Sequence, residues 1–270
     1  MRELDLCSFS KVLPLYTDSD YHMPLLAAAE SKARARVWVD SPAEPCVTAA
    51  CFGVRIYIGG SSSNESNRNA IRSFFNNVVL SNQIERMRHF FMVFWDEPGW
   101  KDVLLDILSV FIPVLREREY YCFDTARNFK PVLLPEGYEY RWVNEGFLNE
   151  RDWGCREILK YEMCSERVSV EDFLKQSYGV CAVSGNEIAG WCLSEYNNST
   201  GCEVGIEVLE DHQRKGVATA LASALVNESR KRGLRCVGWD SFRDNIPSTA
   251  TACKAGFVKY MDFETIIVQR

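Results

Sequence analysis

The sequence contains very little histidine. Only three histidines occur among the 270 residues, at positions 22, 89 and 212. None of them has a cysteine or another histidine at the spacing of a metal site, and transition-metal sites are built mainly from these two side chains. The sequence therefore predicts no zinc enzyme and no bound metal ion.

Long hydrophobic runs are also absent. The chain has no apolar stretch of about 18 residues, the length that a helix needs to cross a bilayer. Residues 1–5 carry acidic side chains, and no sustained apolar segment follows them, which argues against a signal peptide. We therefore expect a cytoplasmic location and no membrane partner.

Positive charge is not in excess. The chain has 31 Lys and Arg against 37 Asp and Glu, for a formal net charge of −6. A nucleic-acid binder usually has the opposite balance. The G-x-G-x-x-G pattern and the P-loop pattern are both missing. The sequence therefore predicts no nucleic-acid partner and no nucleotide-binding fold.

Cysteine, in contrast, is frequent. Eleven cysteines are present without any C-x-x-C pair, and several lie inside apolar runs, as Cys181 does. Buried thiols behave as small hydrophobic side chains, and a secreted disulfide framework is typical of shorter chains. We expect these cysteines to be reduced.

Hydrophobic patterning predicts an α/β fold with a mixed sheet. In the first half, strands are expected over residues 36–39, 46–52, 54–58, 90–95 and 120–123, with helices near 24–35, 69–79 and 98–111. In the second half, strands are expected over 138–143, 178–184, 187–196, 202–209 and 235–240, with helices near 149–161, 170–177 and 217–232. Pro131, Pro135 and Gly137 interrupt the pattern, which places two domains at 1–130 and 136–270.

The stretch from 202 to 233 is the most informative. It contains a strand, a short loop and a helix that begins beside Gly216. The segment from Asp211 to Arg235 carries six cationic side chains and two carboxylates. The first N–H groups of a helix have no partner within it and attract anions. The pattern therefore predicts a phosphate site, although an ordinary strand–helix turn with a solvated basic face explains it as well.

The same stretch resembles a known family. The residues QRKGVA, from Gln213 to Ala218, resemble the Q/R-x-x-G-x-G/A motif of the GNAT superfamily of acyl-CoA-dependent N-acyltransferases. Asn245 and Ser248, followed by Gly256 and Phe257, are similar to its N-x-x-S … G-F segment. The resemblance covers about residues 136–270 and implies a GNAT fold there.

The resemblance also implies where acetyl-CoA, the co-substrate, would bind. Backbone N–H groups of the motif loop would hold the pyrophosphate, and these belong to Gln213, Arg214, Lys215, Gly216, Val217, Ala218 and Thr219. Backbone groups of Val208 and Leu209 would pair with the pantetheine arm. Asn245 and Ser248 would contact the cofactor from the next helix, or serve only as its N-terminal cap.

Transfer to an amine requires a base, because an alkylamine is mostly protonated at pH 7. Glu203 and Glu207 lie on one face of the strand, about 13 Å apart at its usual rise, with Gly205 between them. The resemblance makes Glu203 the first candidate and Glu207 the second. Asp240, at the end of the next strand, is a candidate for binding the substrate ammonium. Each of the three is also explained as a structural carboxylate.

One position departs from the family pattern. Ala252 stands where many GNAT enzymes have a tyrosine that protonates the leaving thiolate. The thiolate would then leave unassisted, or Tyr260, Ser241 or Ser248 would supply the proton. Cys253 has no histidine nearby in sequence to activate it as a nucleophile.

The first half repeats the strand and helix order of the second half but lacks its motif between residues 59 and 69. We interpret it as a degenerate GNAT-like domain or an unrelated α/β domain. For the whole chain the sequence predicts an N-acyltransferase that moves an acetyl group directly from acetyl-CoA to a primary amine, with a small-molecule amine as partner. The alternative is a non-catalytic acyl-CoA-binding or interaction protein. Assembly into a homo-oligomer is left open.

Overall fold

The computed structural model describes residues 1–17 and 22–270, and contacts divide them into two compact units. Unit 1 contains residues 1–118 and 263–270, and unit 2 contains residues 119–262. The sequence instead suggested a boundary near residues 131–135. The difference arises because two long strands, β6 (Val114–Asp124) and β12 (Val258–Gln269), each begin in one unit and end in the other.

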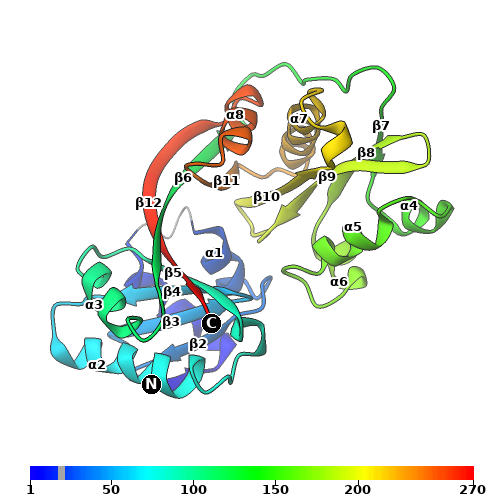
Figure 1. The fold of residues 1–270 in the computed structure, drawn as a ribbon. Helices are drawn as coiled ribbons and strands as arrows, with labels where there is room; N and C mark the ends of the chain where they lie inside the picture. The colour runs from blue at the N-terminus through cyan, green and yellow to red at the C-terminus, as the bar shows by residue number, and fades with distance from the viewer. Residues whose placement is uncertain (18–21) are drawn as a thin grey trace. The chain divides into compact units, whose positions relative to one another are not determined.

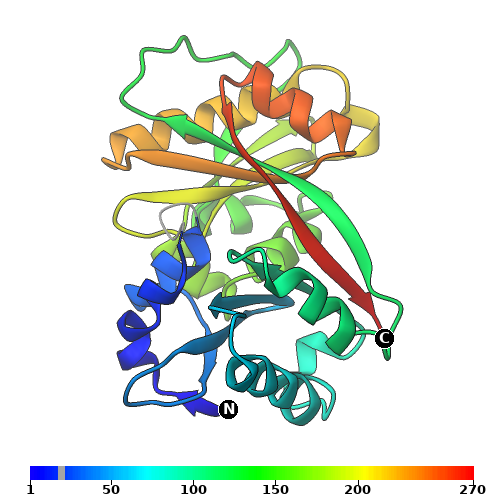
Figure 2. The same ribbon diagram turned by 90° about the vertical axis from the view of Figure 1, so that its left-hand side faces the viewer.

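Unit 1 is a sheet with helices packed on it (Figures 1 and 2). Its strands, in the order β1-β2-β3-β4-β5-β12, are β1 (Arg2–Leu4), β2 (Arg36–Val39), β3 (Val47–Phe52), β4 (Arg55–Gly60), β5 (Phe90–Trp95) and the last residues of β12. Its helices are α1 (Met23–Ala29), α2 (Glu65–Phe74) with the π-helical turn η4 (Phe75–Val79), and α3 (Trp100–Ile107), and the short 3-10 turns are η1 (Leu6–Lys11), η2 (Leu13–Leu15) and η5 (Glu85–Met87). Strands β4 and β5 are parallel. Phe74, Phe91 and Trp100 lie in its core.

Unit 2 contains the remaining strands of the same sheet, with helices on both of its faces (Figure 1). After the first residues of β12, its strands follow the order β6-β11-β10-β9-β8-β7. They are β7 (Glu139–Trp142), β8 (Gly179–Ser184), β9 (Glu187–Glu195), β10 (Gly201–Val208) and β11 (Cys236–Phe242), together with the last residues of β6. The helices are α4 (Glu145–Glu150), α5 (Arg156–Met163), α6 (Val170–Gln176), α7 (Val217–Lys231) and α8 (Ile246–Lys254), and η6 (Glu210–His212) is a 3-10 turn.

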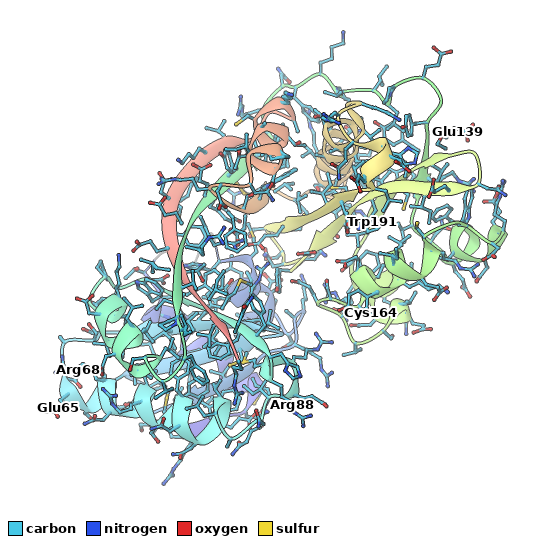
Figure 3. All side chains as sticks on the ribbon, viewed as in Figure 1. Glu65, Arg68, Arg88, Glu139, Cys164 and Trp191 are labelled. Carbon is cyan, nitrogen blue, oxygen red and sulfur yellow. A yellow bond between two sulfur atoms is a disulfide. The ribbon has the colours of Figure 1, made fainter. Side chains whose placement is uncertain are left out.

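In unit 2, each face of the sheet has its own apolar core. On one face, Leu221 and Leu225 of α7 pack with Val237 of β11. On the other, Trp191 of β9 packs with Leu159 of α5, and this tryptophan is labelled in Figure 3. A strand with a helix on each face needs apolar side chains in both directions, which explains why β8 and β9 read as nearly continuous hydrophobic runs.

Most predicted elements agree with the structure, but the helices predicted over 24–35 and 98–111 are shorter, and two others differ more. The single helix predicted over residues 149–161 is two helices, α4 and α5, because Cys155 has a left-handed backbone, with φ 65°, between them. Helix α2 begins at Glu65 rather than near residue 69, since the Asn64 side chain accepts a hydrogen bond from the N–H of Asn67 and caps it. The first turn of α2 is polar, so the sequence shows no helical spacing of apolar residues there.

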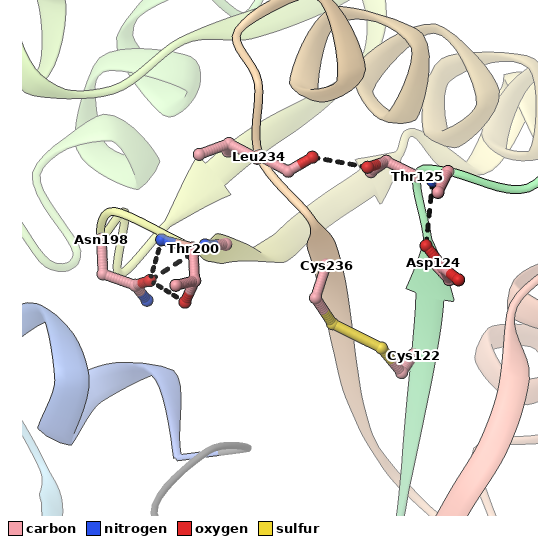
Figure 4. Close-up of a disulfide and its surroundings, with 9 residues drawn as sticks. Cys122, Asp124, Thr125, Asn198, Thr200, Leu234 and Cys236 are labelled. Carbon is pink, nitrogen blue, oxygen red and sulfur yellow. Dashed lines mark hydrogen bonds between the residues drawn. A yellow bond between two sulfur atoms is a disulfide. The ribbon is translucent and has the colours of Figure 1, made fainter.

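Two cysteines differ from expectation. Cys122 on β6 and Cys236 on β11 form a disulfide with their Cα atoms 6.5 Å apart (Figure 4). The prediction of reduced thiols is therefore wrong for this pair, because neighbouring strands bring together residues that are 114 positions apart in sequence. The nine other cysteines are thiols in the described part of the chain, and burial raises the pKa of the Cys202 thiol to about 11.

Within residues 1–17 and 22–270, no helix is long and apolar enough to cross a bilayer.

Candidate cofactor cleft and acceptor face

The central feature of unit 2 is a gap between two parallel strands. Strands β10 and β11 pair only at Gly201 with Cys236, Cys202 with Val237, and Glu203 with Gly238. On its other edge, β10 stays paired with β9 as far as Val208. The two parallel strands therefore separate after Glu203, and one edge of the rest of β10 opens into the gap.

The backbone of β10 presents hydrogen-bonding groups to this gap. The N–H of Leu209 donates to the carbonyl of Ala189 at 3.0 Å, so it is directed toward β9. Because this direction alternates along a strand, the backbone groups of Ile206 and Val208 are on the open edge. The Gln213 side-chain amide reaches the Val208 carbonyl from that side at 2.9 Å. An extended ligand arm could add to the sheet here as an extra strand does.

A cleft of about 610 Å³ continues from the gap to the start of α7. It is lined by Ile206, Glu207, Val208, His212, Gln213, Arg214, Gly216, Val217, Ala218, Thr219, Trp239, Asn245, Pro247, Ser248, Ala250, Thr251 and Lys254. All of these residues belong to unit 2. The lining combines backbone, cations and apolar walls, which suits a long ligand with an anionic end.

The loop before α7 is shaped to expose its N–H groups. Arg214 and Gly216 both have left-handed backbone angles, with φ of 59° and 88°. No side chain caps α7, and a Cβ placed on Gly216 would meet nothing within 4 Å. The first N–H groups of this 15-residue helix therefore face an open end of the cleft, where the helix dipole favours an anion.

The opposite wall of the cleft is formed by α8 and Trp239. The Asn245 side chain accepts from the N–H of Ser248 at 3.3 Å and caps α8. The Ser248 hydroxyl in turn accepts from the Trp239 indole N–H at 3.0 Å. Both polar residues thus have the structural role that the sequence left open, and both also line the cleft.

The structure brings most of the predicted cofactor residues together, with two exceptions. Leu209 uses its N–H toward β9 and does not line the cleft, and the Lys215 ammonium donates to the carbonyl of Asp211 at 2.8 Å within the loop. Lys254 and His212 line the cleft but were not singled out from the sequence. His212 is hydrogen-bonded to the Tyr138 hydroxyl at 2.9 Å. Lys254 lies in the last turn of α8, just before the G-F pair. This closeness to a family segment is the feature of the sequence that could have identified Lys254 as a cleft residue.

The predicted catalytic residues Glu203 and Glu207 lie on the face of β10 that points away from α7. Val204, Ile206 and Val208 pack toward α7, so Glu203 and Glu207 point toward α5. Glu203 is 5% exposed, whereas Glu207 is exposed and lines the cleft. Burial and then the charge of Glu207 raise the pKa of Glu162 on α5. We call this side of the sheet the acceptor face.

The space above Gly205 is filled by the side chain of Glu195. A Cβ placed there would lie 2.0 Å from Oε1 of Glu195. Glu195 stands directly opposite Glu203 in the β9–β10 pair, and its side chain leans along the strand over the glycine. Gly205 therefore makes room for another carboxylate of the acceptor face.

The remaining candidates occupy different places. Asp240 lies two residues beyond Gly238 on β11, so it is on the acceptor face, but it does not line the cleft. Among the alternative proton donors, Ser241 is buried and its hydroxyl donates to the carbonyl of Phe242 at 3.3 Å. Tyr260 is 46% exposed, and Ala252, at the place of the usual tyrosine, is fully buried.

Unit 1 contains the equivalent strand pair without the gap. Strands β4 and β5 stay paired up to Ile58 and Trp95. In the loop before α2, the Glu97 carboxylate accepts from the N–H of Ser62 at 2.9 Å, and the Asn64 side chain accepts from the N–H of Asn67 and caps the helix. The start of α2 is therefore capped by a side chain, unlike the start of α7.

Known proteins resemble the chain at the level of sequence. The model of the GNAT acetyltransferase family matches residues 15–266. The chain is 23% identical over 201 residues to an uncharacterized N-acetyltransferase of Bacillus subtilis, YdfB, and the match covers 74% of this chain and 72% of that protein.

Solved structures resemble it over nearly its whole length. A GCN5-related N-acetyltransferase-like protein from Streptococcus suis superposes with a TM-score of 0.70 at 17% identity, covering 97% of this chain and 98% of that one. A tandem GNAT protein from the clavulanic acid biosynthesis pathway gives a TM-score of 0.63 at 12% identity, covering 99% and 98%. These neighbours confirm the predicted α/β fold class and agree with a two-domain GNAT arrangement.

Proposed function

Because the chain belongs to the GNAT acetyltransferase family, we propose that unit 2 transfers an acetyl group from acetyl-CoA to a primary amine. The observation that carries this proposal is the gap between β10 and β11, which continues into a cleft ending at the uncapped start of α7. The gap suits an extended arm and the helix start suits a pyrophosphate. The family as a whole uses an acyl-CoA, and acetyl-CoA is the specific proposal.

The proposed pose follows the polar groups of the cleft. The pyrophosphate would accept hydrogen bonds from the N–H groups of Val217, Ala218 and Thr219, with Arg214 beside it. The pantetheine arm would pair with the open edge of β10 at Ile206 and Val208. The thioester would then reach the base of the gap, where Glu203 and Gly238 form the last strand pair.

Glu203 is the proposed base. It is buried at the base of the gap and faces the side away from α7, from which an acceptor amine would approach. Its carboxylate would take the proton of the substrate ammonium, and the free amine would attack the thioester carbon directly. The amide C–N bond would form as the C–S bond breaks, and the CoA thiolate would leave and take up the proton released from the amine nitrogen. The carboxylates of Glu195 and Glu207 on the same face favour an acceptor that arrives as a cation.

The experiment that tests this function is a mass-spectrometric screen of an amine library with acetyl-CoA. Products heavier by one acetyl group, formed together with free CoA, are the expected result. If the protein binds acetyl-CoA and acetylates no amine, it is an acyl-CoA-binding protein instead.

Unit 1 should bind no cofactor. Its parallel strands stay paired and the Asn64 side chain caps α2, so we expect calorimetry to give one CoA per chain. A stoichiometry of two would contradict the proposal that unit 1 is a degenerate repeat.

A further inference from the structure

The imidazole of His212 joins three segments of unit 2 beside the cofactor cleft. His212 ends the turn η6, where its N–H donates to the carbonyl of Leu209 at 2.9 Å, and it directly precedes the QRKGVA segment. Its Nδ1 is 2.9 Å from the Tyr138 hydroxyl, and its Nε2 is 3.2 Å from the Glu187 carboxylate. Tyr138 lies just before β7 and Glu187 begins β9, so one side chain ties the loop before α7 to two strands.

The ring is held in place but still faces the cleft. The side chain of His212 is 13% exposed, and the Tyr138 ring stands edge-on to it with the ring centroids 5.6 Å apart. The Cys155 thiol donates to the other oxygen of Glu187 at 3.8 Å. His212 nevertheless lines the same cleft as Gly216, where the pyrophosphate is proposed to bind. A charge on this imidazole therefore acts directly on the cleft.

The two hydrogen-bond partners suit both charge states of the imidazole. An ionised carboxylate can only accept, so the neutral ring carries its proton on Nε2, toward Glu187, and its Nδ1 accepts from the Tyr138 hydroxyl. A protonated ring donates from both nitrogens, and the phenol oxygen then accepts. Only the hydroxyl hydrogen has to rotate between the two states. The ring can therefore gain or lose a proton while the loop keeps its position.

The charged side chains near this ring are of both signs. Those on the elements packed against it are Glu136 and Glu139 beside Tyr138, Glu187 with Arg151, which reaches the adjacent Asn186, then Glu210 and Asp211 of η6, Arg214 and Lys215 of the loop, and Glu207 and Lys254 of the cleft lining. Among the described residues, Glu187 is the charged group that contacts the imidazole. A pyrophosphate bound in the cleft would add negative charge near the ring and so favour its protonated form.

We infer that His212 holds the loop before α7 against β7 and β9 and takes up a proton when acetyl-CoA binds, so that the affinity for the cofactor rises as the imidazole becomes protonated. This inference rests on the proposed function, of which it uses the cofactor site alone. A ligand that prefers the protonated form must take up protons wherever the free ring is partly neutral. Histidine changes its charge between about pH 5 and 8, so the coupling falls within the physiological range.

The test is calorimetry of 3′-dephospho-CoA binding between about pH 5.5 and 8, in pairs of buffers that differ in ionisation enthalpy, which counts the protons taken up. This ligand keeps the diphosphate and lacks the 3′-phosphate, whose second ionisation near about pH 6 would add to the signal. Acetyl-CoA is titrated in parallel, since its own ionisation cancels between variants. His212→Gln keeps a hydrogen-bonding side chain that cannot be protonated. His89→Gln is the matched control, because His89 is an exposed histidine of unit 1.

The wild-type protein and His89→Gln should take up a fraction of a proton near pH 6.5 and should bind about 3- to 10-fold more tightly at pH 6 than at pH 8. His212→Gln should lose both the uptake and the pH dependence. In Glu187→Gln the uptake should occur at lower pH, because the imidazolium has lost its carboxylate partner. The chain has three histidines, so nitrogen-15 NMR can follow each ring, and the His212 signal should titrate at higher pH when the ligand is bound.

Equal proton uptake in the wild-type protein and His212→Gln would overturn the inference, and so would a wild-type protein that takes up no proton. A loss of affinity in His212→Gln that is the same at every pH would show that the residue only holds the loop, which contradicts the coupling. If His212→Gln does not fold, Glu187→Gln and the ring signal decide. Binding without acetylation of any amine contradicts the proposed transferase and leaves these readouts intact, whereas a protein that binds no CoA would contradict both.

Discussion

Replacing Glu203 by glutamine should lower kcat for an alkylamine by about 100-fold or more at pH 7. Glutamine keeps the shape of the side chain but cannot accept the ammonium proton. The affinity for acetyl-CoA should hardly change, because Glu203 does not line the cleft. Steady-state kinetics on the amine found by the screen, together with calorimetry of acetyl-CoA, measures both quantities.

The pH dependence of the loss in kcat shows whether Glu203 acts as the base. At high pH the amine is already free, so the deficit of Glu203→Gln should shrink as pH rises. Glu139→Gln, an exposed strand carboxylate on β7 (Figure 3), is the matched control and should keep full activity. If Glu203→Gln is fully active while Glu207→Gln is not, the base is Glu207. If neither substitution matters, deprotonation occurs in solvent or at Asp240, and the strand carboxylates are structural.

Placing a glutamate at Gly216 should abolish acetyl-CoA binding while the protein remains folded. The new carboxylate would enter the open space at the start of α7, where the pyrophosphate is proposed to bind, and would repel it. Calorimetry with acetyl-CoA should show no heat of binding, and circular dichroism should show the wild-type secondary structure.

The control for this substitution lies at the other end of the same helix. Gly233 also has a left-handed backbone, with φ of 80° against 88° at Gly216, and a Cβ on it would likewise meet nothing within 4 Å. Gly233→Glu therefore carries a comparable backbone strain and the same added charge far from the cofactor, and it should keep wild-type affinity. Wild-type affinity in Gly216→Glu would refute the pyrophosphate assignment. Loss in both variants would attribute the effect to strain.

The strand, loop and helix that hold the proposed phosphate site could be predicted because their signals are local. The alternation along β10, the glycine at 216 and the apolar stripe of α7 lie within about thirty consecutive residues. Such patterns depend on backbone geometry and on which side of an element is buried. The same reasoning failed between residues 145 and 163, where a left-handed Cys155 divides one expected helix into two.

The acceptor face, in contrast, depends on pairings between distant segments. No local pattern states that β10 and β11 separate after Glu203, or that Glu195 covers Gly205. The disulfide between Cys122 and Cys236 and the return of β12 to unit 1 are of the same kind. Strand partners and register are chosen by the packing of whole sheets. The sequence alone therefore determined the family and the anion-binding loop, while the tertiary structure decided which side chains surround the proposed base.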